Sequence, residues 1–177
     1  MPLLLRKRIL AILTDLGYIA LYILVLYIIF SIIKTISGQN TVTWHPVTGQ
    51  AVGFFLLTLP VFFYYYIYEK KFGYTPGKKW NRVYLVFNNR ARAKAAFQRN
   101  FLKLLPWELA HTGGHWLIYY LRQGYSQPPF WVIVLLILPQ LIVIIYIISL
   151  FLSKGKTTYY DKISGTEVAE FPAMEVN

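Results

Sequence analysis

The chain has 177 residues, of which 56% are hydrophobic, 18% aromatic and 14% charged, and its formal net charge at pH 7 is +11. This composition excludes an ordinary soluble domain, in which about 25% of the residues are charged. The absence of cysteine excludes disulfides, thiolate metal sites and cysteine nucleophiles. Because a bilayer span needs about 20 consecutive apolar residues and the sequence holds several such runs, we expect an integral membrane protein.

The first predicted span is 9–33, a run of 25 residues with one charged residue, Asp15. The apolar core of a cleavable signal peptide has about 7–15 residues, so this run is too long for one. The second predicted span, 51–68, contains Pro60 and ends in the sequence FFYYYIY. Aromatic belts of this kind mark the interface between membrane and water. The last predicted span, 131–152, has no charged residue.

A further predicted span, 101–121, is harder to delimit. The run from Pro106 to Leu121 has 16 residues, a helix of about 24 Å, which is short for a hydrocarbon layer of about 30 Å. Either the helix starts before Pro106, which then kinks it, or 95–105 lies on the membrane surface and Pro106 begins the buried helix. The length of the run does not decide between these two starting points of the helix.

The distribution of basic residues predicts the topology. Sixteen of the 18 Lys and Arg residues lie in three segments, 6–8, 70–103 and 154–162, and only Lys34 and Arg122 lie elsewhere. The positive-inside rule places these three segments in the cytoplasm. The chain then crosses the membrane four times, and 101–121 is one of the spans. We therefore predict an all-α membrane protein with four transmembrane helices and both termini cytoplasmic.

The basic segments have local structure of their own. The sequence NRVYLVFNN, 81–89, alternates in character and GTEVAE, 165–170, has the length of a short strand, so the two are predicted to pair. The run NRARAKAAFQRN, 89–100, is basic and helix-prone, as expected of a surface segment that attracts anionic lipid headgroups.

The length leaves room for one small helical bundle but not for an additional soluble catalytic domain. We therefore expect one domain over residues 1–177 that is not an enzyme and needs no cofactor. Basic cytoplasmic loops explain the positive charge, so the expected partner is the lipid bilayer and not nucleic acid.

Four motifs, in order along the chain, resemble the RDD family of small bacterial membrane proteins, which is named for an arginine and two aspartates. RILAILTD resembles the family's opening, with Arg8, Ala11 and Asp15. GYTPGKKWNRVYLV resembles its glycine-lysine loop, FQRNFLKLLP its arginine-asparagine entry to the third span, and YYDKISGTEV its closing motif with Asp161. The closing motif usually has histidine before the aspartate, where this chain has Tyr160.

The resemblance covers residues 6–168 and implies a four-span bundle in a bacterial cytoplasmic membrane. Some members of the family are described as cation/proton antiporters. The resemblance therefore implies cation or proton transport as one possible function of the candidate residues.

Asp15 lies inside the first predicted span, two helical turns after Arg8, so the two side chains project from one face about 10 Å apart. A carboxylate in a span is a functional candidate, because burial brings its pKa toward a titratable range. The structural alternative is an ion pair between Asp15 and Arg8 or another basic residue.

Glu108, His111 and His115 are spaced by three and four residues, so on a helix they lie on one stripe. Such a stripe can pass protons or bind a monovalent cation, or hold a metal ion by way of the two histidines. It can also be polar packing against Asp15 and Gln140, with Thr112, Gly113 and Gly114 allowing close helix approach. The depth of Glu108 is comparable to that of Asp15, so the two carboxylates could share one site.

Asp161 lies in the tail, outside the predicted spans. It either gates the cytoplasmic mouth by pairing with Arg8 or a loop arginine, or caps backbone N–H groups in a turn. From these residues we predict a protein that handles cations or protons, acting as a homo-oligomer or with a membrane partner subunit. The alternative is a structural or accessory subunit of a membrane complex without transport activity.

Overall fold

The computed structural model describes residues 1–37, 45–88 and 90–172. The long helices are α1 (Leu3–Ser37), α5 (Arg92–Arg122) and α6 (Phe130–Leu152), and a fourth segment runs without interruption through α2 (Pro46–Gly53), the π-helix η1 (Phe54–Thr58) and α3 (Leu59–Phe72). Two short helices, α4 (Pro76–Trp80) and α7 (Tyr159–Ser164), and two strands, β1 (Val83–Phe87) and β2 (Thr166–Glu170), complete the described elements.

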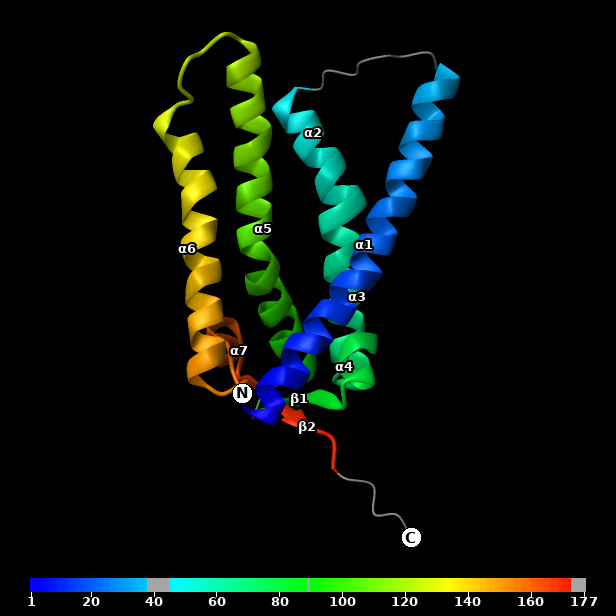
Figure 1. Ribbon diagram of the computed structural model, residues 1–177, viewed down its shortest axis with the longest axis vertical. Helices are drawn as coiled ribbons and strands as arrows, with labels where there is room; N and C mark the ends of the chain where they lie inside the picture. Colours follow the sequence, from blue (N-terminus) through cyan, green and yellow to red (C-terminus); the bar gives the residue numbers. More distant parts are fainter. Residues whose placement is uncertain (38–44, 89, 173–177) are drawn as a thin grey trace.

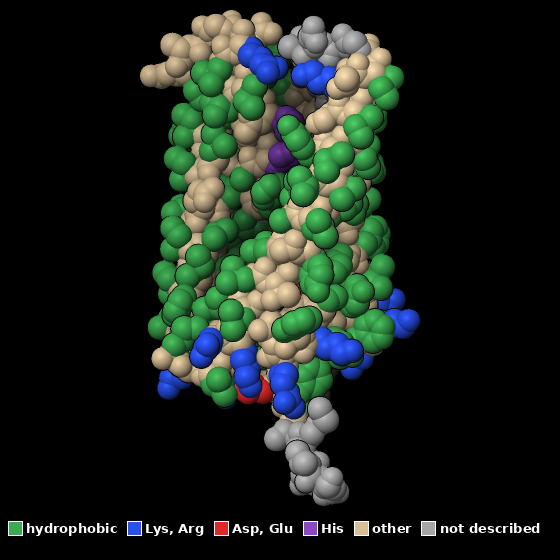
Figure 2. Space-filling view, turned by 45° about the vertical axis from the view of Figure 1, so that its right-hand side comes forward, with side chains coloured by type: hydrophobic (Ala, Val, Ile, Leu, Met, Phe, Trp, Pro, Cys, Tyr) green, Lys and Arg blue, Asp and Glu red, His purple; other side chains and the backbone are tan. Residues whose placement is uncertain are grey.

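The four long segments run alternately up and down, and the short elements gather at one end of the bundle (Figure 1). The start of α1, the helices α4 and α7 and both strands lie at this end, which we call the basic end. Lys and Arg side chains crowd it in Figure 2, whereas hydrophobic side chains cover the flank above it. We call the opposite end, which holds the α5–α6 connection, the loop end.

Three described helical segments are long and apolar enough to cross a membrane: Leu3–Ser37, Pro46–Phe72 and Phe130–Leu152. Most of their large apolar side chains point outward, as lipid-facing side chains do. The protein is therefore a multi-pass membrane protein. The helix α5 packs along α6, but charged and polar side chains interrupt its apolar sequence.

Three prolines, Pro60, Pro106 and Pro139, lie inside long segments, and at the first two a tyrosine binds the carbonyl that the proline leaves free. Pro60 has no N–H for the carbonyl of Leu56, and the hydroxyl of Tyr22 donates to that oxygen at 2.6 Å. Pro106 lies inside α5. The hydroxyl of Tyr146 donates at 3.0 Å to the carbonyl of Leu102, four residues before Pro106. In lipid, where water cannot satisfy a free carbonyl, these bonds let both segments continue through their prolines.

The continuity of α5 settles where this helix begins. It starts at Arg92, well before Pro106, so the interpretation in which Pro106 begins the helix is wrong. Residues 92–100, predicted to be a surface segment, are its first turns, and Ala95, Ala96, Arg99 and Asn100 are buried. Gly113 meets Leu135 and Leu136 of α6, as expected for close approach, whereas an added Cβ at Gly114 would meet nothing within 4 Å.

The predicted strands form and pair. β1 and β2 are antiparallel, with Val83 opposite Glu170 and Phe87 opposite Thr166. Val83, Leu85 and Val168 form a small apolar core with Ala11 of α1. These contacts pack the first half of α1 against both strands of the antiparallel pair. Residue 89 of the predicted strand segment lies outside the described residues.

The two halves of α1 have different environments. Its buried residues, Leu5, Arg8, Ala11 and Asp15, all belong to the half at the basic end. Beyond Asp15, α1 leans away from α2 toward the loop end (Figure 1), and no side chain of residues 16–37 is buried. The first half is therefore the anchored part of the helix.

Candidate functional site

A chain of buried ion pairs links five elements at the basic end. Asp161 of α7 binds Arg8 of α1 and Arg99 of α5, and Arg99 also binds Glu69 of α3, which binds Lys78 of α4. The side chains of these residues are at most 7% exposed. Removing a charge from water is costly unless its partners are well placed. The five elements that carry these ion pairs are therefore fixed relative to one another.

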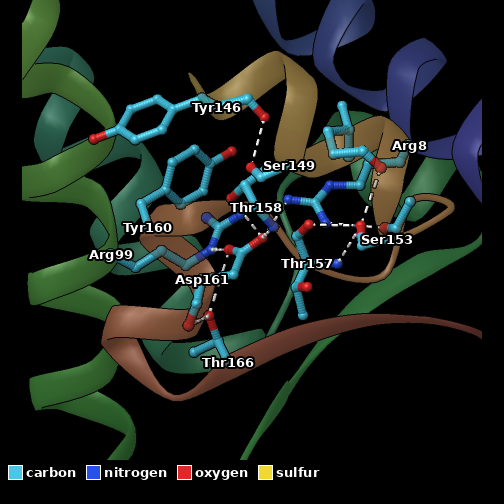
Figure 3. A network of polar contacts seen from close by, with 12 residues as sticks. Arg8, Arg99, Tyr146, Ser149, Ser153, Thr157, Thr158, Tyr160, Asp161 and Thr166 are labelled. Atoms are coloured by element: carbon cyan, nitrogen blue, oxygen red, sulfur yellow. Dashed lines mark hydrogen bonds and ion pairs between the residues drawn. The ribbon is translucent and has the colours of Figure 1, made fainter. Parts of the chain in front are cut away.

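Asp161 lies between the guanidinium groups of Arg8 and Arg99 (Figure 3). One carboxylate oxygen accepts from Arg99 Nε at 2.7 Å. The other accepts from Arg8 and, at 2.8 Å each, from the backbone N–H and hydroxyl of Thr158, which closes a capping box at the start of α7. Burial would raise the pKa of Asp161, but the charges of Arg99 and Arg8 outweigh it and hold this pKa below its usual range. The arginine pair and the cap predicted for Asp161 therefore occur together, and the gating role stays a prediction.

Arg8 reaches Asp161 because a glycine lets the tail approach α1. Arg8 Nη1 donates to the carbonyl of Gly155 at 2.9 Å. Gly155 has φ +92°, and a Cβ there would lie 2.6 Å from Cα of Leu5. A side chain at this position would therefore be strained and would also collide with α1.

Asp15 is enclosed at the basic end, and no arginine of the described residues pairs with it. Its carboxylate accepts from the hydroxyls of Tyr64 at 2.8 Å and Thr75 at 2.6 Å, and from the backbone N–H of Gly77 at 2.9 Å. A Cβ on Gly77 would lie 2.6 Å from the carboxylate oxygen, so glycine is needed for this approach. The predicted pairing of Asp15 with Arg8 is wrong, because Arg8 is held by Asp161.

Sequence reasoning did not select several members of the cluster at the basic end. These are Glu69, Lys78, Arg99, Asn100 and Lys103. Asn100 donates to Glu69 at 2.7 Å, and the ammonium of Lys103 lies 3.1 Å from the ring centre of Tyr65. Burial lowers the pKa of Lys78 to about 8, with Arg99 acting in the same direction and Glu69 opposing it.

A usable signal for this buried face was present in the sequence. Ala95, Ala96, Arg99 and Asn100 follow helical spacing, and all four are buried. Two alanines and a polar pair on one stripe indicate a helix face that packs closely.

Glu108 lies in the middle of the bundle, apart from the basic end. One carboxylate oxygen accepts from the amide of Gln50, and the other accepts from the hydroxyl of Thr58 at 2.7 Å. Among the described residues, no Lys or Arg nitrogen lies within 4.0 Å of either oxygen. Thr58 belongs to η1, and π-helical turns are frequent at functional sites. The carboxylate thus has hydrogen bonds but no countercharge.

His111 and His115 lie toward the loop end from Glu108, with their Nε2 atoms 3.1 Å apart. Glycines of α2 leave room for both rings: a Cβ on Gly53 would lie 2.2 Å from His111, and one on Gly49 would lie 2.8 Å from His115. The Nδ1 atom of His111 and the Oε1 atom of Gln50 are buried and form no hydrogen bond within the described residues. Histidine side chains are visible at the back of a hollow in Figure 2.

The predicted stripe is real, but two of its interpretations are not supported. In the part of the chain that the structure describes, no group of three or more His, Asp or Glu side chains could hold a metal ion. Gln140 is exposed, so it is not part of the packing predicted around Glu108.

The two carboxylates in the predicted spans belong to different sites. Glu108 is bound by Thr58 and Asp15 by Tyr64. These partners lie six residues apart, about 9 Å along a helix, and within the part of the chain that the structure describes the carboxylates share no hydrogen-bond partner. The prediction that they share one site is therefore wrong.

Comparison with known proteins bears on the chain as a whole. The sequence profile of the RDD family matches residues 4–165. No curated protein and no solved structure matches the chain. The matched range includes Arg8, Asp15 and Asp161, the three positions of the motifs described above. The chain belongs to the RDD family.

Proposed function

We propose that the protein exchanges monovalent cations for protons across a bacterial cytoplasmic membrane, with Glu108 as the group that binds either one. The observation that carries this proposal is the carboxylate of Glu108, which lies in the middle of the bundle with hydrogen bonds from Gln50 and Thr58 but without a Lys or Arg partner among the described residues. An isolated charge in that environment is costly. In this proposal a bound proton or cation compensates that charge.

The proposed topology has α5 as a fourth span and both termini in the cytoplasm. α5 has 31 residues and packs along α6, and a helix of that length reaches about 46 Å. The gathering of basic side chains at one end supports a cytoplasmic basic end by the positive-inside rule. Glu108 then lies within the membrane, about 16 residues from the start of α5 and about 24 Å along the helix.

In the proposed cycle, a cation displaces the proton of Glu108, and the proton returns when the cation leaves. Oxygen atoms suit hard cations, and three side chains supply them here: Glu108, Thr58 and Gln50, whose Oε1 is free of hydrogen bonds among the described residues. His111 and His115 form the proton path toward the loop end, since their ring nitrogens are within hydrogen-bond distance of each other. Exchange of one monovalent cation for one proton transfers no net charge.

The remaining candidates, Arg8, Asp15 and Asp161, are assigned to the frame that holds this site. All three are buried and are bound by partners at the basic end. In this proposal the protein carries out no covalent chemistry and is not an enzyme.

The proposal is tested in proteoliposomes that contain a pH-sensitive dye. Gradients of Na⁺, K⁺ and Li⁺ are imposed in turn on wild-type protein, on Glu108→Gln and on the matched control Glu167→Gln, a half-exposed carboxylate of β2. We expect a cation-driven pH change in wild type and in the control and none in Glu108→Gln. Absence of a pH change with folded wild-type protein, for all three cations, would refute antiport of these ions.

A second candidate, a structural subunit of a membrane complex, is favoured by the outer half of α1. No side chain of residues 16–37 is buried, which leaves a long apolar face for a partner helix or for a second copy of the chain. Crosslinking in native membranes distinguishes the two functions. A fixed complex with a different protein, together with an absence of flux, would favour the subunit. A homo-oligomer with flux would favour the transporter.

A further inference from the structure

One amide side chain lies on the outer side of an uncharged span. Gln140 is ten residues from the start of α6 and twelve from its end, and it is exposed. No residue of α6 is charged. Figure 1 shows α6 at one edge of the bundle, with α5 packed along it. The amide of Gln140 therefore lies near the middle of a membrane span, on a side of the helix that the bundle does not cover.

The amide differs from other polar side chains of the long helices in its hydrogen bonds. The hydroxyl of Thr35 donates to the carbonyl of Ser31, in its own helix, at 2.9 Å. The hydroxyl of Ser149 likewise donates to the carbonyl of Tyr146 at 2.8 Å. Within the described residues, Tyr146 and Ser149 are the residues of α6 whose side chains form hydrogen bonds, and Gln140 is not among them. An amide without a partner is costly in lipid, where no water can bind it.

The exposed side of α6 has a heptad pattern with Gln140 at its centre. Residues separated alternately by four and three positions lie on one face of a helix, which we call the heptad face, and here they are Ile133, Ile137, Gln140, Ile144, Ile147 and Phe151. The five apolar members are each at least 36% exposed. The face is about 27 Å long, close to the hydrocarbon thickness of about 30 Å. Apolar residues in this spacing are typical of a helix that packs along another helix.

The amide favours a protein neighbour over lipid on this face. Isoleucine side chains alone gain little by leaving lipid, because lipid tails are equally apolar. A hydrogen bond between helices, in contrast, satisfies a group that lipid cannot. The neighbouring helix must therefore carry a polar group at the depth of Gln140.

A second copy of the chain supplies that group by symmetry. Two copies inserted in the same orientation have parallel α6 helices, so identical residues lie at the same depth. Around a two-fold axis, a residue on the axis contacts the same residue of the other copy. A carboxamide both donates and accepts hydrogen bonds, so the two Gln140 side chains complement each other.

We propose that two copies of the chain associate through the heptad face of α6, with their Gln140 side chains hydrogen-bonded to each other. A single polar residue in a heptad core fixes the register of the two helices, which holds the apolar residues of both copies in contact. The inference is independent of the proposed antiport, because Glu108 and its partners Gln50 and Thr58 lie on other elements.

Disulfide crosslinking tests the interface directly, because the chain contains no cysteine. Ile137→Cys and Ile144→Cys place a single thiol on the heptad face. Leu138→Cys and Ile145→Cys are matched controls: each is the next residue, also exposed, at nearly the same depth but about 100° around the helix. The full-length variants are oxidised in native membranes, and the disulfide-linked dimer is quantified.

We expect dimer from the two variants on the heptad face and little from the two controls, because a disulfide needs Cα atoms within about 7 Å. Equal yields from both pairs, or no dimer from Ile137→Cys and Ile144→Cys, would overturn the proposal. Crosslinking of these two variants to a different protein in place of a second copy would overturn it as well.

The role of the amide is tested by energy transfer between labelled copies in liposomes over a range of protein-to-lipid ratios. Gln140→Leu should weaken association about 3- to 30-fold, as expected for loss of hydrogen bonds between helices in a membrane. Gln140→Asn keeps an amide and should weaken association less. Leu138→Ala, on the other side of α6, should not change it. Association of Gln140→Leu equal to that of wild type would overturn the proposed contact between the amides.

Discussion

The two polar regions of the bundle differ in how their charges are balanced. At the basic end, Asp161 and Glu69 are each bound by an arginine and a further polar partner, and every one of these charges is buried. Around Glu108, hydrogen bonds are present but no countercharge is within reach among the described residues. Two buried atoms, one on Gln50 and one on His111, also form no hydrogen bond there.

We therefore distinguish a structural frame, the ion-paired residues at the basic end, from a candidate binding site around Glu108. A network of buried ion pairs holds one arrangement, although Oδ1 of Asn100 forms no hydrogen bond within the described residues. An acidic group without a countercharge is costly until something binds it. Arg8 and Asp161 belong to the first region. Asp15 lies at the same end with three hydrogen bonds, but like Glu108 it has no ion pair among the described residues. The following predictions test this division, beginning with the largest effect.

Arg99→Met should have the largest effect on stability. The guanidinium of Arg99 binds both Asp161 and Glu69, and removing one partner of a buried ion pair costs about 3–5 kcal/mol. Because two carboxylates lose a partner, we expect about 5 kcal/mol or failure to fold. Heat-induced unfolding in detergent measures the loss. Lys94→Met, at an exposed position of the same helix, is the control, and equal loss in both variants would contradict the role given to Arg99.

Asp161→Asn should cost about 3 kcal/mol at neutral pH, the lower end of the range for a buried pair, because asparagine still offers an oxygen to Thr158. The arginines hold the pKa of Asp161 below its usual range against the effect of burial. A folded-state pKa below the unfolded value of about 3.9 gives stabilisation that is complete above that pH and is lost as the pH falls further.

The stability gap between wild type and Asp161→Asn should therefore be constant near neutrality and close as the pH falls below about 4. Unfolding by denaturant over a pH series measures the gap. A gap that widens in acid would mean that Asp161 is not stabilised as a carboxylate.

Gly53→Ala should reduce proton-coupled flux several-fold with little change in stability. A Cβ at this position would lie 2.2 Å from the ring of His111, so the ring must move away and its contact with His115 changes. The proteoliposome assay measures the flux. Gly17→Ala is the control, since a Cβ there would meet nothing within 4 Å. Unchanged flux in Gly53→Ala would argue against a proton path through the histidines.

Tyr146→Phe and Tyr22→Phe should have the smallest effects. Each removes the hydroxyl that binds a carbonyl left free by a proline, and a single hydrogen bond contributes about 0.5–1.5 kcal/mol. We expect a loss of about 1 kcal/mol in each, measured as a shift of the unfolding midpoint. Tyr125→Phe, an exposed position near the loop end, should show no shift. A shift of the same size in Tyr125→Phe would contradict the claim that the hydroxyls of Tyr22 and Tyr146 stabilise the helices at their prolines.

The sequence predicts local structure well here because each local signal has one physical cause. Apolar runs locate the three spanning segments, and alternation locates the strands that form the antiparallel ribbon. Helical spacing places Glu108, His111 and His115 on one stripe. Each of these predictions depends on residues that are close together in the chain.

Partners distant in the chain could not be predicted in the same way. Arg8 and Asp161 are 153 residues apart, and Asp15 at two turns from Arg8 was the nearer candidate. Arg8 binds Asp161 and not Asp15 because Gly155 lets the tail approach α1 and Gly77 brings a backbone N–H to Asp15. Likewise, Gln50 and Thr58 carry no charge and gave no signal that they bind Glu108.

The most direct test compares Glu108→Gln and Asp161→Asn in one experiment, with heat stability and cation-driven flux per folded molecule measured on the same preparations. The account predicts that Glu108→Gln keeps the stability of wild type and loses the flux, and that Asp161→Asn loses stability and keeps the flux of the molecules that remain folded. Flux retained in Glu108→Gln, or a loss of stability there equal to that of Asp161→Asn, would contradict the division into frame and site.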